Sequence, residues 1–169
     1  MANDNEKLLL LSTFNFEIRL TPSVGYESDK RKPGKFIANG GFQEASGLEV
    51  DMDIQEYYEG GRNDAVVRRI GRARYNNIIL KRGMLYSTKN NSQVVKQLWE
   101  WFQNIVSGGP PLRYNGIIEV KDRKGTTVLA KWAFDRGLPA RVRGPELNAK
   151  TGEIAIEELH IAHEGLRLL

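Results

Sequence analysis

The chain has 169 residues, of which 40% are apolar and 27% charged, a composition typical of one soluble globular domain spanning residues 1–169. It contains no cysteine and two histidines, which excludes disulfide bonds, thiolate chemistry and a multi-histidine metal centre. The net charge of +4 is mildly basic and bears on solubility and partners rather than on fold.

The N-terminal segment, residues 1–13, carries one short apolar run, Leu8 to Leu11, which follows an acidic, amide-rich stretch. A secretory signal needs a basic start and an apolar region of about 7–15 residues. A membrane span needs about 20 apolar residues. We therefore expect a cytoplasmic product that does not associate with membranes.

The first half of the chain predicts a series of strands. Residues 14–20 alternate apolar and polar side chains, which predicts a half-buried strand. Residues 21–35 are rich in Pro, Gly, Ser and charge and predict a loop insertion. Further strands are predicted over residues 36–44, over residues 48–55 with one acidic face, and over residues 75–81.

One amphipathic helix is predicted over residues 91–107. Ser92 is a suitable N-cap, large apolar side chains recur every three or four residues, and Gly108 begins a Gly-Gly-Pro-Pro stop. The apolar side chains that we expect to pack against the sheets are Val95, Leu98, Phe102 and Ile105.

Strand patterns return after the helix. Residues 117–121 and 126–134 predict a hairpin across an Asp-Arg-Lys-Gly turn, and residues 138–142 and 153–163 predict a further pair. Together the segments predict a mainly β fold, an antiparallel β-barrel or sandwich of two sheets with one α-helix packed outside.

No group of residues has the spacing of a catalytic or cofactor site. His160 and His163 lie three apart on a predicted strand, so they point to opposite faces and cannot share a metal. Acid–base catalysis needs two carboxylates in contrasting environments, whereas Asp51 and Asp53 line one face of a strand. We therefore expect no enzyme activity, no cofactor and no bound metal.

The strongest charge bias is basic and lies between Arg62 and Arg82, where seven basic residues accompany one acid, Asp64. A nucleic-acid groove would combine such charge with several stacking aromatics, and this stretch offers Tyr75 alone. One interpretation is a small β-barrel module that binds nucleic acid through this stretch. The favoured interpretation is a protein–protein seam, in which the acidic strand of one copy meets the arginines of another.

Four motifs follow one another along the chain: residues 41–49 (GFQEASGLE), 56–63 (EYYEGGRN), 75–83 (YNNIILKRG) and 156–166 (IEELHIAHEGL). In this order and spacing they resemble the tail tube proteins of contractile phages. They are equally similar to the inner tube proteins of phage-tail-like contractile injection systems. The similarity runs from about Phe14 to the C-terminus.

The resemblance implies a ring of six copies and a hollow tube of stacked rings, which sheath contraction drives through a target envelope. The implied partners are copies of the chain itself, sheath, baseplate and spike proteins, and a lumen payload or tape-measure protein, with nucleic acid only as lumen cargo. Such a tube would be assembled in the bacterial cytoplasm and would belong to a phage virion or a phage-tail-like particle. The family brings no catalytic residues.

We predict that residues 56–70 form an extended loop or hairpin that reaches a neighbouring copy. Alternating strands should place core on one side and the lumen wall on the other. Because a strand is rigid, most of its acids and arginines should pair between copies rather than within one. The predicted contact residues between subunits and rings are Asp51, Asp53, Glu56, Tyr57, Tyr58, Glu59, Gly60, Gly61, Arg62, Asn63, Arg68, Arg69, Arg72 and Arg74.

Overall fold

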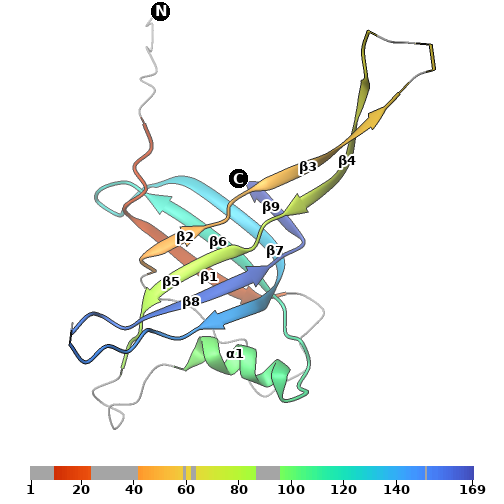
Figure 1. Cartoon of the computed structure of the whole chain (residues 1–169). Helices are drawn as coiled ribbons and strands as arrows, with labels where there is room; N and C mark the ends of the chain where they lie inside the picture. The colour runs from red at the N-terminus through yellow and green to blue at the C-terminus, as the bar shows by residue number, and fades with distance from the viewer. Residues whose placement is uncertain (1–9, 24–41, 59, 62–63, 87–95, 151) are drawn as a thin grey trace, which may run out of the picture.

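The structure, a computed structural model, describes residues 10–23, 42–58, 60–61, 64–86, 96–150 and 152–169. Within these residues the chain forms nine strands and one helix (Figure 1). In chain order they are β1 (Phe16–Pro22), β2 (Glu44–Ser46), β3 (Val50–Tyr57), β4 (Val67–Tyr75), β5 (Ile78–Gly83), α1 (Gln97–Val106), β6 (Tyr114–Lys121), β7 (Val128–Arg143), β8 (Ile156–Ala162) and β9 (Gly165–Leu168).

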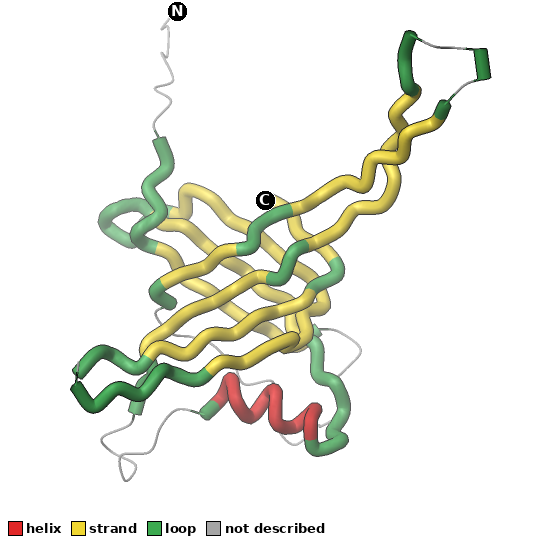
Figure 2. Tube along the Cα trace, viewed as in Figure 1, coloured by secondary structure: helices red, strands yellow, loops and turns green. Residues whose placement is uncertain are grey.

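Seven of these strands form the body, an antiparallel sheet that folds over on itself into two layers (Figure 2). The strand order is β1-β6-β7-β8-β5-β2, and β9 pairs with the first part of β7. The remaining two strands, β3 and β4, pair only with each other and project from the body. This architecture confirms the predicted fold class.

β7 belongs to both layers because it turns a corner near its middle. Residues up to Gly137 pair with β6 or β9, and residues from Leu138 onward pair with β8. At the corner Arg136 has a φ of 54°, and its backbone N–H donates to Asn115 Oδ1 at 2.9 Å. Glu164 also accepts hydrogen bonds from Arg113 and Arg136, each at 2.7 Å. These bonds hold a backbone conformation that non-glycine residues rarely adopt.

The core lies between the two layers and is built from the inward side chains of the alternating strands. Phe134, on β7, is 1% exposed and lies against two glycines, Gly116 of β6 and Gly137 of β7. A methyl group on Gly116 would overlap the Phe134 ring, so the ring occupies the space that a side chain would need. The other buried apolar side chains of this cluster include Ile18, Leu20, Ile78, Leu80, Ile118, Leu159 and Ile161.

α1 lies against one end of the body beside β7 (Figure 2). Leu98 and Trp101 are buried, and Ile105 packs partly against the core, as predicted for Leu98 and Ile105. Trp101 Nε1 donates to the Leu112 carbonyl at 2.9 Å. Phe102 is only half-buried, while Ser92 and Val95 lie outside the described residues.

Several predicted boundaries differ from the structure. Residues 138–142 are not a separate strand, because they continue β7 past its corner. Residues 153–155 are not strand, so β8 covers only part of the strand predicted over residues 153–163, and β9, which follows after a turn, was not predicted. β4 was not predicted, and the strand predicted over residues 75–81 corresponds to β5. β1 continues two residues into the predicted 21–35 loop. Residues 24–41, which hold the rest of that loop and most of the predicted second strand, lie outside the described part.

Candidate assembly surface

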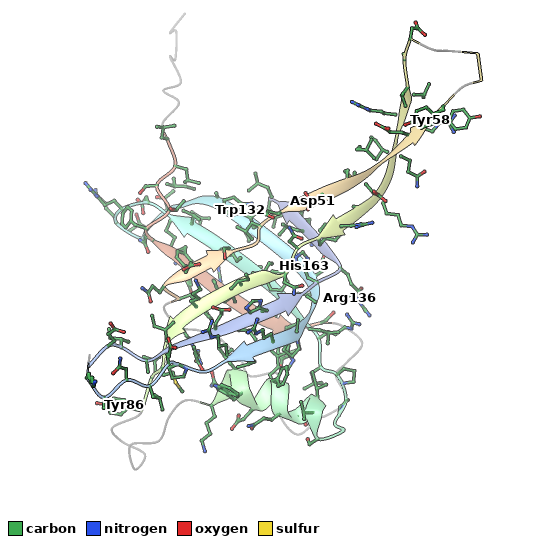
Figure 3. All side chains as sticks on the ribbon, viewed as in Figure 1. Asp51, Tyr58, Tyr86, Trp132, Arg136 and His163 are labelled. Carbon is green, nitrogen blue, oxygen red and sulfur yellow. The ribbon has the colours of Figure 1, made fainter. Side chains whose placement is uncertain are left out.

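The pair of strands β3 and β4, here called the arm, is the most exposed regular structure among the described residues (Figure 3). Every residue of β3 is exposed, and on β4 only Val67 and Gly71 are half-buried. A two-stranded sheet is marginally stable on its own in water. An arm of this length, on which no layer of the described residues packs, is therefore expected to gain stability from another surface.

One side of the arm is apolar. The register places Val50 opposite Tyr75, Met52 opposite Ala73 and Ile54 opposite Ile70, and directly opposed residues share a face. A bulge, in which Gly71 and Arg72 oppose Asp53, keeps Ile70 on this face. The set, called the apolar face, is Val50, Met52, Ile54, Ile70, Ala73 and Tyr75.

The apolar face is open to solvent within one copy. Met52 and Ile54 are 54% and 52% exposed, and Ile70 is 73% exposed. Contiguous exposed apolar surface of this kind marks an interaction site in a soluble protein. The sequence pattern over residues 48–55 revealed this side of β3, but the expectation that it would face the chain's own core was wrong.

Two ion pairs join charged side chains of the arm within one copy. Arg68 Nε lies 3.4 Å from Glu56 Oε1, and Arg74 Nη2 lies 3.6 Å from Asp53 Oδ2. The antiparallel register makes these two pairs possible because it puts the residues on adjacent strands; pairing of the other arm charges between copies stays a prediction. Exposed pairs of this kind contribute about 0–1 kcal/mol each and are screened by salt.

The predicted contact residues gather on the arm. Asp51, Asp53, Glu56 and Tyr57 lie on β3, and Arg68, Arg69, Arg72 and Arg74 lie on β4. Tyr58 follows β3 towards the tip, where its hydroxyl donates to Glu56 Oε2 at 3.2 Å; Gly60 and Gly61 turn the chain there. Arg69 lies over the Tyr57 ring at 5.0 Å. Glu59, Arg62 and Asn63 lie outside the described residues. The predicted set did not include the exposed apolar side chains Val50, Met52, Ile54 and Ile70.

The carboxylates and histidines of the body are engaged in bonds that hold the fold. Glu157, 1% exposed, accepts from Arg82 at 2.5 Å and from Trp99 at 3.1 Å. Glu158 pairs with His160, whose hydrogen bond lowers the pKa of the Glu158 carboxyl. Across the described residues no three metal-ligating side chains converge, and no helix there is long and apolar enough to cross a membrane.

A folded-over antiparallel sheet with a projecting apolar arm defines a structural subunit built to contact other chains. The chain belongs to the family described as T4-like virus tail tube protein gp19, which it matches over residues 12–167. It is thus a structural subunit of a contractile tail tube. The family match gives no support to the nucleic-acid-binding alternative.

Solved structures show the same fold at low sequence identity. A chain of the anti-feeding prophage baseplate aligns with a TM-score of 0.75 and 18% identity, covering 96% of this chain and 97% of that one. A chain of the anti-feeding prophage cap aligns with a TM-score of 0.70 and 20% identity, covering 100% and 99%. A chain of the sheath-tube complex of the PVC extracellular contractile injection system aligns with a TM-score of 0.69 and 19% identity, covering 95% and 91%. No curated protein matches the chain.

Proposed function

We propose that six copies of the chain form a ring, that rings stack into a hollow tube, and that the arm joins neighbouring copies through its apolar face. The observation that carries this proposal is the exposure of that face in a single copy of a tail tube protein. Ile54 and Ile70 keep about half and three-quarters of their surfaces in water. Burying this exposed surface against a neighbouring copy would stabilise the contact by about 1–2 kcal/mol for each side chain.

The tube's expected surroundings follow from the family and from its structural neighbours. Related folds occur in a baseplate, in a tube-terminating cap and in a sheath-tube complex. By this likeness the proposed partners are sheath, baseplate and spike proteins, with a payload or tape-measure protein in the lumen. The proposed role is mechanical and non-catalytic, and the tube would be assembled in the bacterial cytoplasm as part of a virion or tail-like particle.

Negative-stain microscopy of the purified chain tests the proposal. The parent should form rings or tubes, and the double variant Ile54→Ser, Ile70→Ser should stay monomeric with an unchanged far-UV circular dichroism spectrum. The matched control is Gln55→Ser, one residue along β3 and on the opposite face, which should assemble like the parent. Normal tubes from the double variant would contradict a role for the apolar face.

The charges of the arm are tested separately. Arg68→Glu with Arg69→Glu removes the Arg68–Glu56 ion pair and adds two acids to β4. Loss of tubes that is reversed by adding Glu56→Lys would show that assembly needs the Arg68–Glu56 ion pair within the arm. Unchanged tubes would mean that the contact depends on the apolar face alone and that these arginines lie on a solvated surface.

A further inference from the structure

The arm joins the body through two linkers that contact each other. In the linker before β3, Gly47 has a φ of +80°, and a side chain there would overlap the backbone carbonyl of Asn77 in the linker after β4. Asn76 Nδ2 also donates to Glu49 Oε2 at 2.6 Å. These four residues, Gly47, Glu49, Asn76 and Asn77, form one unit, here called the arm root.

One side chain of the body, His163, contacts the arm root (Figure 3). It lies in the turn between β8 and β9, and its Nε2 is 3.0 Å from the Asn76 carbonyl oxygen. Its Nδ1 is 3.0 Å from the Gly165 carbonyl oxygen. Its ring lies 5.4 Å from the ring of Tyr75, at the end of β4, and 5.7 Å from the core ring of Phe134. His163 therefore bridges the core of the body and the base of the arm.

The two oxygens that His163 faces can only accept hydrogen bonds. A neutral imidazole has one N–H donor and one bare nitrogen, whereas the imidazolium has two donors. In the neutral form one ring nitrogen would therefore place its lone pair against a carbonyl oxygen at 3.0 Å. The observed geometry is fully bonded only when both nitrogens carry protons.

The charged groups around His163 are bonded elsewhere. Glu164, the next residue, accepts from Arg113 and Arg136, and Asp135 of β7 pairs with Arg167 of β9. On the arm side, Asn76 donates to Glu49 at 2.6 Å and to Asp51 at 3.5 Å. On β8, His160 pairs with Glu158. A proton on His163 therefore acts mainly through the two carbonyl oxygens rather than through a carboxylate partner.

We propose that His163 is a positioning residue that sets the direction of the arm, and that it does so fully only when doubly protonated, so that tube assembly depends on the protonation of this side chain. The proposal rests on the proposed contact between the arm and a neighbouring copy. An arm of fixed direction presents its apolar face to the neighbour without first losing conformational freedom. Losing one charge-assisted hydrogen bond per copy should lower the amount of tube about tenfold or more.

The direction of the arm can be measured without assembly. The chain has no cysteine, so spin labels can be placed at Tyr58→Cys near the arm tip and Lys124→Cys on the body, in the Ile54→Ser, Ile70→Ser background. Electron–electron double resonance should give a narrow distance distribution at about pH 5.5 and a broader one at about pH 8.5, since histidine changes charge in this interval. The His163→Phe variant keeps a ring between Tyr75 and Phe134, and its distance distribution should be broad at both pH values.

The second histidine provides the matched control, because His160→Phe should keep the pH dependence of the parent. If the labelled chain that keeps both histidines gives a narrow distance distribution at both pH values, the proposal is overturned. A pH dependence that survives His163→Phe but disappears in His160→Phe would also overturn it. Sedimentation of the assembly-competent chain gives the second readout: a pH-dependent arm in a chain that never forms tubes would sustain the role of His163 and refute the proposed function.

Discussion

Replacing Glu157 by glutamine tests how much the buried ion pair between Glu157 and Arg82, which also contacts α1, contributes to the stability of the fold. Glu157 is 1% exposed and Arg82 is 3% exposed, and the Arg82 Nε to Glu157 Oε1 distance is 2.5 Å. The second carboxylate oxygen accepts the Trp99 indole N–H at 3.1 Å. In Glu157→Gln, the guanidinium of Arg82 stays buried without an opposite charge, and the side-chain amide cannot accept both bonds in the same geometry.

The expected loss is large because the unpaired charge remains in the interior. Removing one partner of a buried ion pair typically costs about 3–5 kcal/mol. For a domain of this size, each kcal/mol lowers the melting temperature by about 2–4 °C, so the expected decrease is about 6–20 °C. Replacing both charges, Arg82→Met with Glu157→Leu, should recover most of this loss, since no charge is then left without a partner.

Thermal unfolding followed by circular dichroism measures the effect. All variants should carry Ile54→Ser and Ile70→Ser, because assembly would otherwise add to the apparent stability. Glu158→Gln is the matched control: Glu158 is adjacent on β8, is partly exposed and pairs with His160, so a decrease of at most about 4 °C is expected. A Glu157→Gln variant that melts within this same margin of its parent would refute the reasoning.

Three further changes address the core, the helix and a turn. Leu98→Ala should cost about 2–5 kcal/mol because Leu98, on the buried face of α1, is 1% exposed, and an unchanged melting temperature would show that this face is not packed. Gly116→Ala should destabilise by about 1–3 kcal/mol through overlap with the Phe134 ring, and denaturant titration showing no loss would contradict that packing. The Asp122 carboxylate accepts the backbone N–H of Thr127, which lowers its pKa, so its contribution is present above about pH 4 and is lost as the pH falls through the lowered value. The melting temperatures of the parent and Asp122→Asn should therefore differ at neutral pH and converge in acid, and a difference that persists at about pH 2 would exclude this cause.

Much of the body could be predicted from local pattern. The alternation around Ile18 predicted β1, and the apolar spacing around Leu98 predicted α1 to within one residue of its end at Val106, although the helix begins at Gln97 rather than at residue 91. The hairpin of β6 and β7 followed from two alternating segments flanking a short turn. Such features depend on side chains close in sequence, whose periodicity is set by the geometry of the strand or helix that they form.

The structure of the arm could be predicted only in part from the sequence pattern. The alternation in β3 correctly predicted a strand with one apolar side, but an alternating strand looks the same whether that side meets its own core or another chain. β4, with four arginines, gave no clear strand pattern, and its pairing with β3 comes from the register of the folded chain. The ion pairs Arg68–Glu56 and Arg74–Asp53 depend on that register and could therefore not be predicted from the sequence pattern.

The sequence by itself determined that this chain is a mainly β, cysteine-free member of a tube-forming family, because composition and motif order are properties of the chain alone. Only the tertiary structure decided that Glu157 is buried with Arg82, that β7 turns a corner at Arg136, and that His163 faces two carbonyl oxygens. Each of these depends on segments far apart in the sequence. Burial, backbone strain and hydrogen-bond partners are set by which segments meet, and that choice minimises the free energy of the whole packed chain rather than of any one segment.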